Sequence, residues 1–302
     1  MPTCSVIIPT YNAQDFIEGT LKSVLNQIDA SPQLIIVDDG SSDDTVAVAK
    51  KHFDGTIIQQ ANGGDSAARN TGLKTIDTDF VLFLDHDDIL EPNAIVSHLG
   101  AFETHSDAVM VVGSNLKIDE NGTLIGDNIL PANNFTSHDV ANGFTPSFSQ
   151  CMYRRDALSA IGGFRPEAGM GADHDLNLRL LGSSRLGHCH GKVVMSYRQH
   201  QNQQTRSPAK LYNKHISILR EHLGPTGFMA EPEFLSKVEK RWKTYYGQFI
   251  PSEVARMMLQ RKFGRMSYAL QTFVRMQPYA SVGAIKYFSG YFRKKTPKLN
   301  AS

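Results

Sequence analysis

The 302-residue sequence predicts an α/β fold, in which a mixed, mostly parallel sheet is flanked by helices and followed by a C-terminal helical extension. Two observations favour this class. Short apolar runs alternate with amphipathic helical stretches through residue 112, a pattern typical of parallel sheets covered on both faces. Beyond Pro208 the pattern is almost wholly helical. We therefore expect two domains, residues 1–206 and residues 207–302.

The individual elements follow from these patterns in chain order. Strands are expected at residues 5–8, 34–37, 56–58, 80–84 and 108–112, with helices in each interval. A hairpin turning at Asn121-Gly122 should come next, because Asn-Gly favours tight turns between strands. The pattern then predicts a long loop at residues 126–150, a strand at 150–153, helices at 155–161 and 174–182, and a strand at 193–197.

The bulk composition is ordinary for a soluble globular protein, with 41% hydrophobic and 20% charged residues. The first residues lack the pattern of a signal peptide, and no apolar run approaches the roughly 18 residues of a membrane span. Three widely separated cysteines do not suggest a disulfide framework. We therefore expect a cytoplasmic protein.

Charge is distributed unevenly along the chain. Ten of the 31 Lys and Arg lie at or after Arg256, where there is no Asp or Glu, which leaves 21 basic and 30 acidic residues before it. A basic tail of this kind predicts an anionic partner, here a peripheral contact of residues 256–298 with anionic lipid at the inner face of the plasma membrane. The alternative is a helical bundle that packs its aromatic face on the first domain. No nucleic-acid-binding module accompanies the charge, so no nucleic-acid partner is expected.

Polar clusters follow the first four predicted strands. Their sequences are PTYN from Pro9, DDGSS from Asp38, NGGD from Asn62 and DHDD from Asp85. Any one of them is explained equally well as a helix cap or a turn. Ligands of such sheets bind beyond the carboxyl ends of the strands, so four clusters on one rim indicate a binding site.

The last cluster places Asp85, Asp87 and Asp88 within four positions. Like charges this close raise one another's pKa unless a positive group lies among them. Mn²⁺ or Mg²⁺ would supply that charge, because these ions take carboxylate oxygens and also bind substrate phosphates. The alternative is a solvated turn in which Asp87 or Asp88 caps the next helix.

Two other phosphate-binding folds are excluded by missing glycines. The turn after the first strand has no glycine until Gly19, unlike a dinucleotide fold, and no Gly-Lys-Ser/Thr sequence indicates a P-loop. Phosphate would then be neutralised by the metal and by Arg69, which lies just after the glycine turn. A nucleotidyltransferase remains an alternative, although the glycine-rich signature expected near its start is absent.

Seven motifs occur in an order and spacing that resembles the family 2 glycosyltransferases of the GT-A fold. They span residues 3–206 and read SVIIPTYN, IIVDDGSSDDT, NGGDSAARNTGL, FLDHDD, GGFRPE, GADHDLNLRL and YRQHQNQQTR. The resemblance implies inverting transfer of a sugar from a nucleoside-diphosphate donor, most simply a UDP-sugar. It implies a glycan or lipid-linked acceptor in bacterial-type cell-surface polysaccharide or glycolipid synthesis.

The resemblance also implies roles for individual residues of the donor site. Asp85 and Asp87 would form an Asp-x-Asp element, with Asp87 as direct ligand of Mn²⁺ or Mg²⁺ and His200 as a second contact to the metal or the diphosphate. A structural role for His200 is an equal alternative. The remaining donor-site residues would bind the base and the phosphates: Pro9, Tyr11, Asp38, Asp39, Arg69.

For the acceptor, the resemblance implies that Asp173 is the general base and that Asp175 helps to bind the acceptor. Ala172 replaces the glutamate usual in this motif, which favours an alternative: a nucleotide-sugar-binding protein with impaired catalysis. Asp173 is also suited to capping a helix at residues 175–181. A zinc site at His188 and His190 is a weak alternative, because no fourth ligand is evident.

Overall fold

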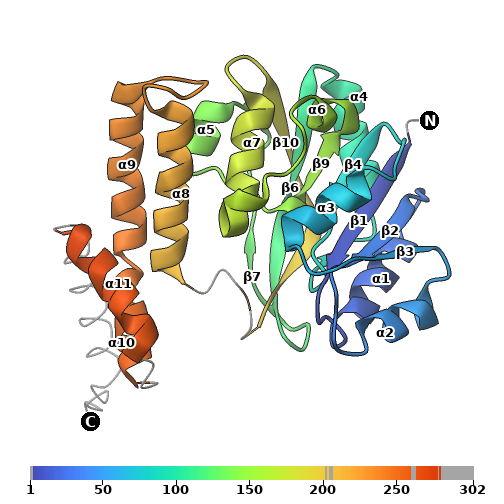
Figure 1. Cartoon of the computed structure of the whole chain (residues 1–302). Helices are drawn as coiled ribbons and strands as arrows, with labels where there is room; N and C mark the ends of the chain where they lie inside the picture. Colours follow the sequence, from blue (N-terminus) through green and yellow to red (C-terminus); the bar gives the residue numbers. More distant parts are fainter. Residues whose placement is uncertain (1–2, 201–202, 204–206, 260–262, 278, 280–302) are drawn as a thin grey trace, which may run out of the picture. The chain divides into compact units, whose positions relative to one another are not determined.

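The computed structural model describes residues 3–200, 203, 207–259, 263–277 and 279. The chain divides into two compact units, Met1–Gln203 and Gln204–Ser302; the sequence pattern placed this boundary at residue 206. The first unit holds a ten-stranded sheet flanked by helices (Figure 1). The predicted α/β class is therefore confirmed.

The sheet is mixed. Its strands follow the order β3-β2-β1-β4-β9-β6-β10-β5, with β7 paired to β6 and β8 paired to β10. The pairs β1/β2, β1/β4, β2/β3 and β6/β10 are parallel, and the others are antiparallel. The strands are β1 (Cys4–Thr10), β2 (Gln33–Asp38), β3 (Thr56–Gln59), β4 (Phe80–Phe83), β5 (Ile89–Leu90), β6 (Ala108–Asp119), β7 (Leu124–Asn128), β8 (Asn133–Phe135), β9 (Cys151–Arg154) and β10 (Leu186–Gln199).

Helices connect most of these strands. Those of the first unit are α1 (Ile17–Leu25), α2 (Thr45–His52), α3 (Asp65–Leu73), α4 (Ala94–Thr104), α5 (Ser137–Ala141), α6 (Arg155–Ala160) and α7 (Ala172–Leu181), with 3₁₀ turns η1 (Phe148–Gln150) and η2 (Pro166–Gly171). The prediction of a long loop at residues 126–150 was wrong. That segment contains β8, α5 and η1, which are short and polar and so lack a clear apolar period.

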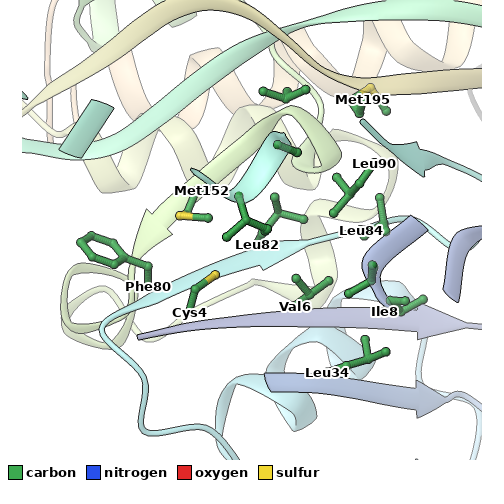
Figure 2. Packing of buried hydrophobic residues seen from close by; sticks show 14 of the residues in the cluster. Cys4, Val6, Ile8, Leu34, Phe80, Leu82, Leu84, Leu90, Met152 and Met195 are labelled. Atoms are coloured by element: carbon green, nitrogen blue, oxygen red, sulfur yellow. The ribbon is translucent and has the colours of Figure 1, made fainter. Parts of the chain in front are cut away.

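The core explains how the sheet and its helices are fixed. Alternate residues of β1 point to opposite faces, and Cys4, Val6 and Ile8 pack with residues of β4 on one face (Figure 2). Ile7 faces α3 on the other side, where a Cβ atom added to Gly72 would lie 2.6 Å from Ile7 Cγ2. Because only glycine permits this approach, α3 lies close against β1, and this close packing fixes the position of Arg69 one turn earlier.

Strand register brings the polar clusters together. Thr10 of β1 pairs with Asp38 of β2, and Asp38 pairs in turn with Gln59 of β3. On the other side of β1, the backbone N–H of Leu84 donates to Ile7 O at 3.0 Å. The four clusters that follow these strands therefore lie along one rim, as the parallel arrangement predicts.

The second unit contains α8 (Pro208–Leu223), α9 (Pro232–Gly247), α10 (Ile250–Leu259) and α11 (Phe263–Arg275). The Trp242 ring stacks on Tyr246 with centroids 5.5 Å apart, and the Tyr246 hydroxyl lies 3.1 Å from His215 Nδ1. Across the described part of both units, no helix combines the length and the apolar character that a membrane crossing needs. Most of the basic segment 256–298 lies outside the described residues.

Candidate functional site

The acidic cluster forms a tight turn directly after β4. The backbone N–H of Asp88 donates to Asp85 O at 3.1 Å, and Thr20 Oγ1 of α1 lies 2.8 Å from the carbonyl oxygens of both His86 and Asp88. Asp88 is fully buried, whereas Asp85 and Asp87 are partly exposed. The main chain of the turn is thus fixed by Thr20 of α1, and two of its carboxylates reach the surface.

A positive partner for this cluster comes from the chain itself. Arg69 of α3 donates through Nη2 to Asp85 Oδ1 at 2.6 Å, and its guanidinium lies 4.4 Å from the centre of the Phe148 ring. Burial raises the pKa of Asp85, as does the charge of Asp87, while Arg69 opposes the increase. Arg69 therefore neutralises part of the rim before any ligand binds, a contact that the sequence pattern did not predict.

Asp173 lies in the first turn of α7 and joins this charged group. Burial raises the pKa of Asp173 to about 6; the charge of Asp85 raises it further, while the charge of Arg69 and the His174 N–H oppose the increase. The helix begins at Ala172 with Gly171 as N-cap, so Asp173 does not cap a helix at residues 175–181. A half-buried carboxyl with a pKa near neutrality is suited to taking a proton from a hydroxyl group.

Asp87 and His200 meet at the same rim. Asp87 Oδ2 lies 2.8 Å from His200 Nε2, and the two side chains are 16% and 11% exposed. Arg198 of β10, two residues before His200, donates through Nε to Asp87 O at 2.9 Å. An imidazole nitrogen and a carboxylate oxygen are both good ligands of Mn²⁺.

The donor set fits a metal that also binds its substrate. Among the described residues, no group of three or more His, Cys, Asp or Glu side chains could hold a metal ion. Asp87 and His200 would supply two ligands, and the remaining positions of Mg²⁺ or Mn²⁺ are usually filled by water and substrate phosphates. The residues present are thus suited to an ion that is held jointly by the chain and a diphosphate.

The four residues predicted to bind the base lie at the ends of β1 and β2. Tyr11 is 43% exposed, which leaves its ring open to a base, while Pro9, Asp38 and Asp39 are buried. The two carboxylate oxygens of Asp39 accept hydrogen bonds from Gln60 Nε2 at 2.7 Å, from Gly63 N at 2.9 Å and from Gly64 N at 2.7 Å. Asp39 therefore holds the glycine turn in place, a role that the sequence pattern did not predict.

Asp175 requires a correction. It was predicted to bind the acceptor, but it is 0% exposed and its carboxylate accepts from Arg165 Nη2 at 2.7 Å and from Arg179 Nε at 2.9 Å. Arg179 donates in turn to the carbonyl oxygens of Ile161 and Gly163. A carboxylate buried between two arginines does not reach an acceptor, so Asp175 fixes α7 to the segment before it.

The weak zinc alternative at His188 and His190 gains no further ligands. His190 Nε2 lies 3.1 Å from His98 Nδ1, and the His188 ring stacks on His105 at 3.4 Å. These are two histidine pairs, one between α4 and β10 and one between His105, directly after α4, and β10. Neither pair belongs to a cluster able to hold a metal among the described residues.

Three residues at the rim were not singled out by the sequence. Ser149, Arg198 and Thr20 bond to the acidic turn from segments that are 64, 110 and 68 positions away in sequence. Serine, arginine and threonine are common everywhere, and nothing local distinguishes these three. Only the folded contacts identify them.

Comparison with known proteins agrees with this geometry. Residues 5–162, more than half of the chain, match the family model described as glycosyl transferase family 2. The chain is 29% identical over 206 residues to the chondroitin synthase of Escherichia coli, which covers 64% of this chain and 29% of that protein. It is 26% identical over 206 residues to the hyaluronan synthase of Pasteurella multocida, which covers 64% and 21%. It therefore spans less than a third of either relative.

A solved structure shares the fold. The crystal structure of S. aureus TarS 1-349 in complex with UDP-GlcNAc has a TM-score of 0.63 at 20% identity, and the match covers 95% of this chain and 92% of that one. The family model, whose match includes the polar clusters after the first four strands, confirms the resemblance inferred from the motifs. The chain belongs to glycosyl transferase family 2.

Proposed function

We propose that this chain is an inverting glycosyltransferase that moves a sugar from a nucleoside-diphosphate donor, most simply a UDP-sugar, to an acceptor hydroxyl. The observation that carries the proposal is the Arg69–Asp85 ion pair at the turn after β4, whose charges act on the pKa of Asp173, together with the Asp87–His200 pair at the same turn. Further support comes from the crystal structures of S. aureus TarS 1-349, which was solved in complex with UDP-GlcNAc and with UDP. Relatives named as chondroitin and hyaluronan synthases favour a cell-surface polysaccharide or a glycolipid as the product.

The donor diphosphate would lie against Asp87 and His200, with Tyr11 offering its exposed ring to the base. Mn²⁺ or Mg²⁺ bound at Asp87 and His200 would stabilise the negative charge of the departing diphosphate. Arg69 would help to stabilise the same negative charge, since the ion pair with Asp85 fixes its guanidinium next to that carboxylate.

Asp173 would serve as the general base. In its charged form it accepts the proton of the acceptor hydroxyl while the acceptor oxygen bonds to the anomeric carbon and the bond to the diphosphate breaks. Its pKa of about 6 leaves it mostly charged near pH 7, yet basic enough to accept a proton. One displacement from the opposite face inverts the anomeric configuration.

A peripheral contact with anionic membrane is proposed for the basic segment 256–298. The support is the excess of Lys and Arg in that segment, each of which contributes on the order of 1 kcal/mol near an anionic surface. Such a contact at the inner face of the plasma membrane would suit a lipid-linked acceptor. Co-sedimentation with phosphatidylserine-containing vesicles, compared with neutral vesicles, tests it.

The test of the enzymatic proposal is transfer itself. Purified protein is incubated with a panel of UDP-, GDP- and dTDP-sugars, Mn²⁺ and glycan acceptors, and release of nucleoside diphosphate is measured together with the anomeric configuration of the product. Asp173→Asn should lower turnover about 10²- to 10⁴-fold with little change in donor affinity. The matched control is Asp54→Asn. Asp54 is exposed and precedes the start of β3, whereas the rim lies at the carboxyl ends of the strands. Donor binding without turnover in the wild type would favour the catalytically impaired binding protein instead.

A further inference from the structure

The acidic turn is joined to a distant loop by one buried serine. Ser149 of η1 is 0% exposed, and its hydroxyl group accepts a hydrogen bond from Asp85 N at 3.1 Å and donates one to Asp88 Oδ2 at 2.8 Å. One side chain thus bonds to both the first and the last acidic residue of the turn. The contact between Ser149 and Asp88 is fully buried, so losing either side chain would leave the other polar group without this partner.

Asp88 extends this connection to β10. Its other oxygen, Oδ1, accepts from the backbone N–H of Arg198 at 3.1 Å, and the Arg198 side chain donates to Asp87 O at 2.9 Å. His200 follows two residues later and reaches Asp87 Oδ2 at 2.8 Å. The distance between Asp87 and His200 therefore depends on where Asp88 holds the end of β10.

We propose that Ser149 and Asp88 act as one positioning unit, which sets the geometry of the Asp87–His200 pair and so the affinity of the rim for a cation and a diphosphate. Neither side chain reaches the ligand, since both are fully buried. The part of this proposal that concerns diphosphate affinity rests on the proposed function. Its geometric part concerns Asp87 and His200 alone and is tested without any ligand.

Residues that orient a metal ligand through hydrogen bonds typically change metal affinity by about 10- to 100-fold when they are removed. We expect Asp88→Ala and Ser149→Ala each to weaken binding of UDP in the presence of Mn²⁺ by about that factor. The double variant should be weakened no more than about two-fold beyond the worse single variant, because both substitutions break the same connection. Two independent effects would instead multiply.

The matched control is Ser5→Ala. Ser5 is also 0% exposed and makes two side-chain hydrogen bonds, to Gln33 and Thr78, but it lies near the start of β1, away from the rim. It should lower thermal stability in the same way and leave UDP affinity unchanged. If Ser5→Ala weakens binding as much as Ser149→Ala, general loosening explains the effect and the proposal is overturned.

The ligand-free readout is the NMR signal of the His200 ring, assigned by its loss in His200→Gln. Ser149→Ala and Asp88→Ala should shift this signal in the nucleotide-free protein, and Ser5→Ala should not. If Asp88→Ala does not fold, Ser149→Ala decides the result alone. An unchanged ring signal overturns the positioning unit. A shifted signal, together with a wild type that binds none of UDP, GDP and dTDP in the presence of Mn²⁺, overturns the proposed function and leaves the positioning unit intact.

Discussion

Lowering the pH from 7.5 to 5 should reduce the rate of sugar transfer about ten-fold, because Asp173 would lose the charge that accepts the proton. The pKa of this carboxyl is raised to about 6 from an ordinary value of 3.8, mainly by burial. A shift of this size corresponds to roughly 3 kcal/mol between the two protonation states. With a pKa near 6, about 90% of the protein is in the active form at pH 7 and about 10% at pH 5. Turnover should therefore rise with pH through 6 and level off above 7.

A second substitution tests the origin of the shift. Asp85→Asn removes a negative charge that raises the pKa of Asp173, and it leaves Arg69, which lowers that pKa. The acid limb of the profile should then move to lower pH, whatever the loss in absolute rate.

The assay is the release of nucleoside diphosphate at saturating donor between pH 4.5 and 8.5, with donor affinity measured at each pH as the control. A profile that is flat from pH 5 to 7 would refute the assignment of Asp173 as the base. An acid limb that stays in place in Asp85→Asn would refute the electrostatic coupling between the two carboxylates.

The remaining predictions concern stability and the correction at Asp175. Asp175→Ala should lower the free energy of unfolding of the first unit by about 3–5 kcal/mol in urea titrations, since it leaves two arginines without their shared carboxylate, with little change in donor affinity. Gly72→Ala should cost about 1–3 kcal/mol in the same assay because its Cβ would meet Ile7; a neutral result would show that α3 can move away from β1. Burial lowers the pKa of His215 from 6.5 to about 4, so folding favours the neutral imidazole. The free energy of unfolding therefore has its full value above pH 6.5 and decreases as the pH falls toward 4. We expect a loss of about 3 kcal/mol in the second unit between pH 7 and 4, followed by the fluorescence of Trp242, and a smaller loss in His215→Gln.

The parts of the fold that the sequence predicted are those with local patterns. The apolar runs at residues 34–37 and 80–84 are buried strands, and the clusters that follow them lie on one rim because parallel strands share their direction. The segment 126–150 was missed because β8 and α5 are three and five residues long. Their order comes from pairing with β10 and packing on α7, which no local period reveals.

The candidate site shows the same division. Residue types and spacing singled out Asp85 and Asp87, and the family resemblance singled out Asp173. The partner of Asp85 and the contact of Asp175 with Arg165 were not predictable, because both join different elements of the fold, whereas Arg179 lies four residues after Asp175 on the same helix. Arg69 and Asp85 are 16 positions apart, and Arg165 approaches Asp175 only because η2 turns back onto α7.

The most direct test of whether the rim binds a diphosphate through a cation is calorimetric titration of the protein with UDP. The titration is carried out once with Mn²⁺ and once with a chelator. We predict binding that weakens at least ten-fold when the ion is removed, and a similar loss in Asp87→Asn with Mn²⁺ present. Equal affinity with and without the ion, or an Asp87→Asn variant that binds like the wild type, would contradict the account.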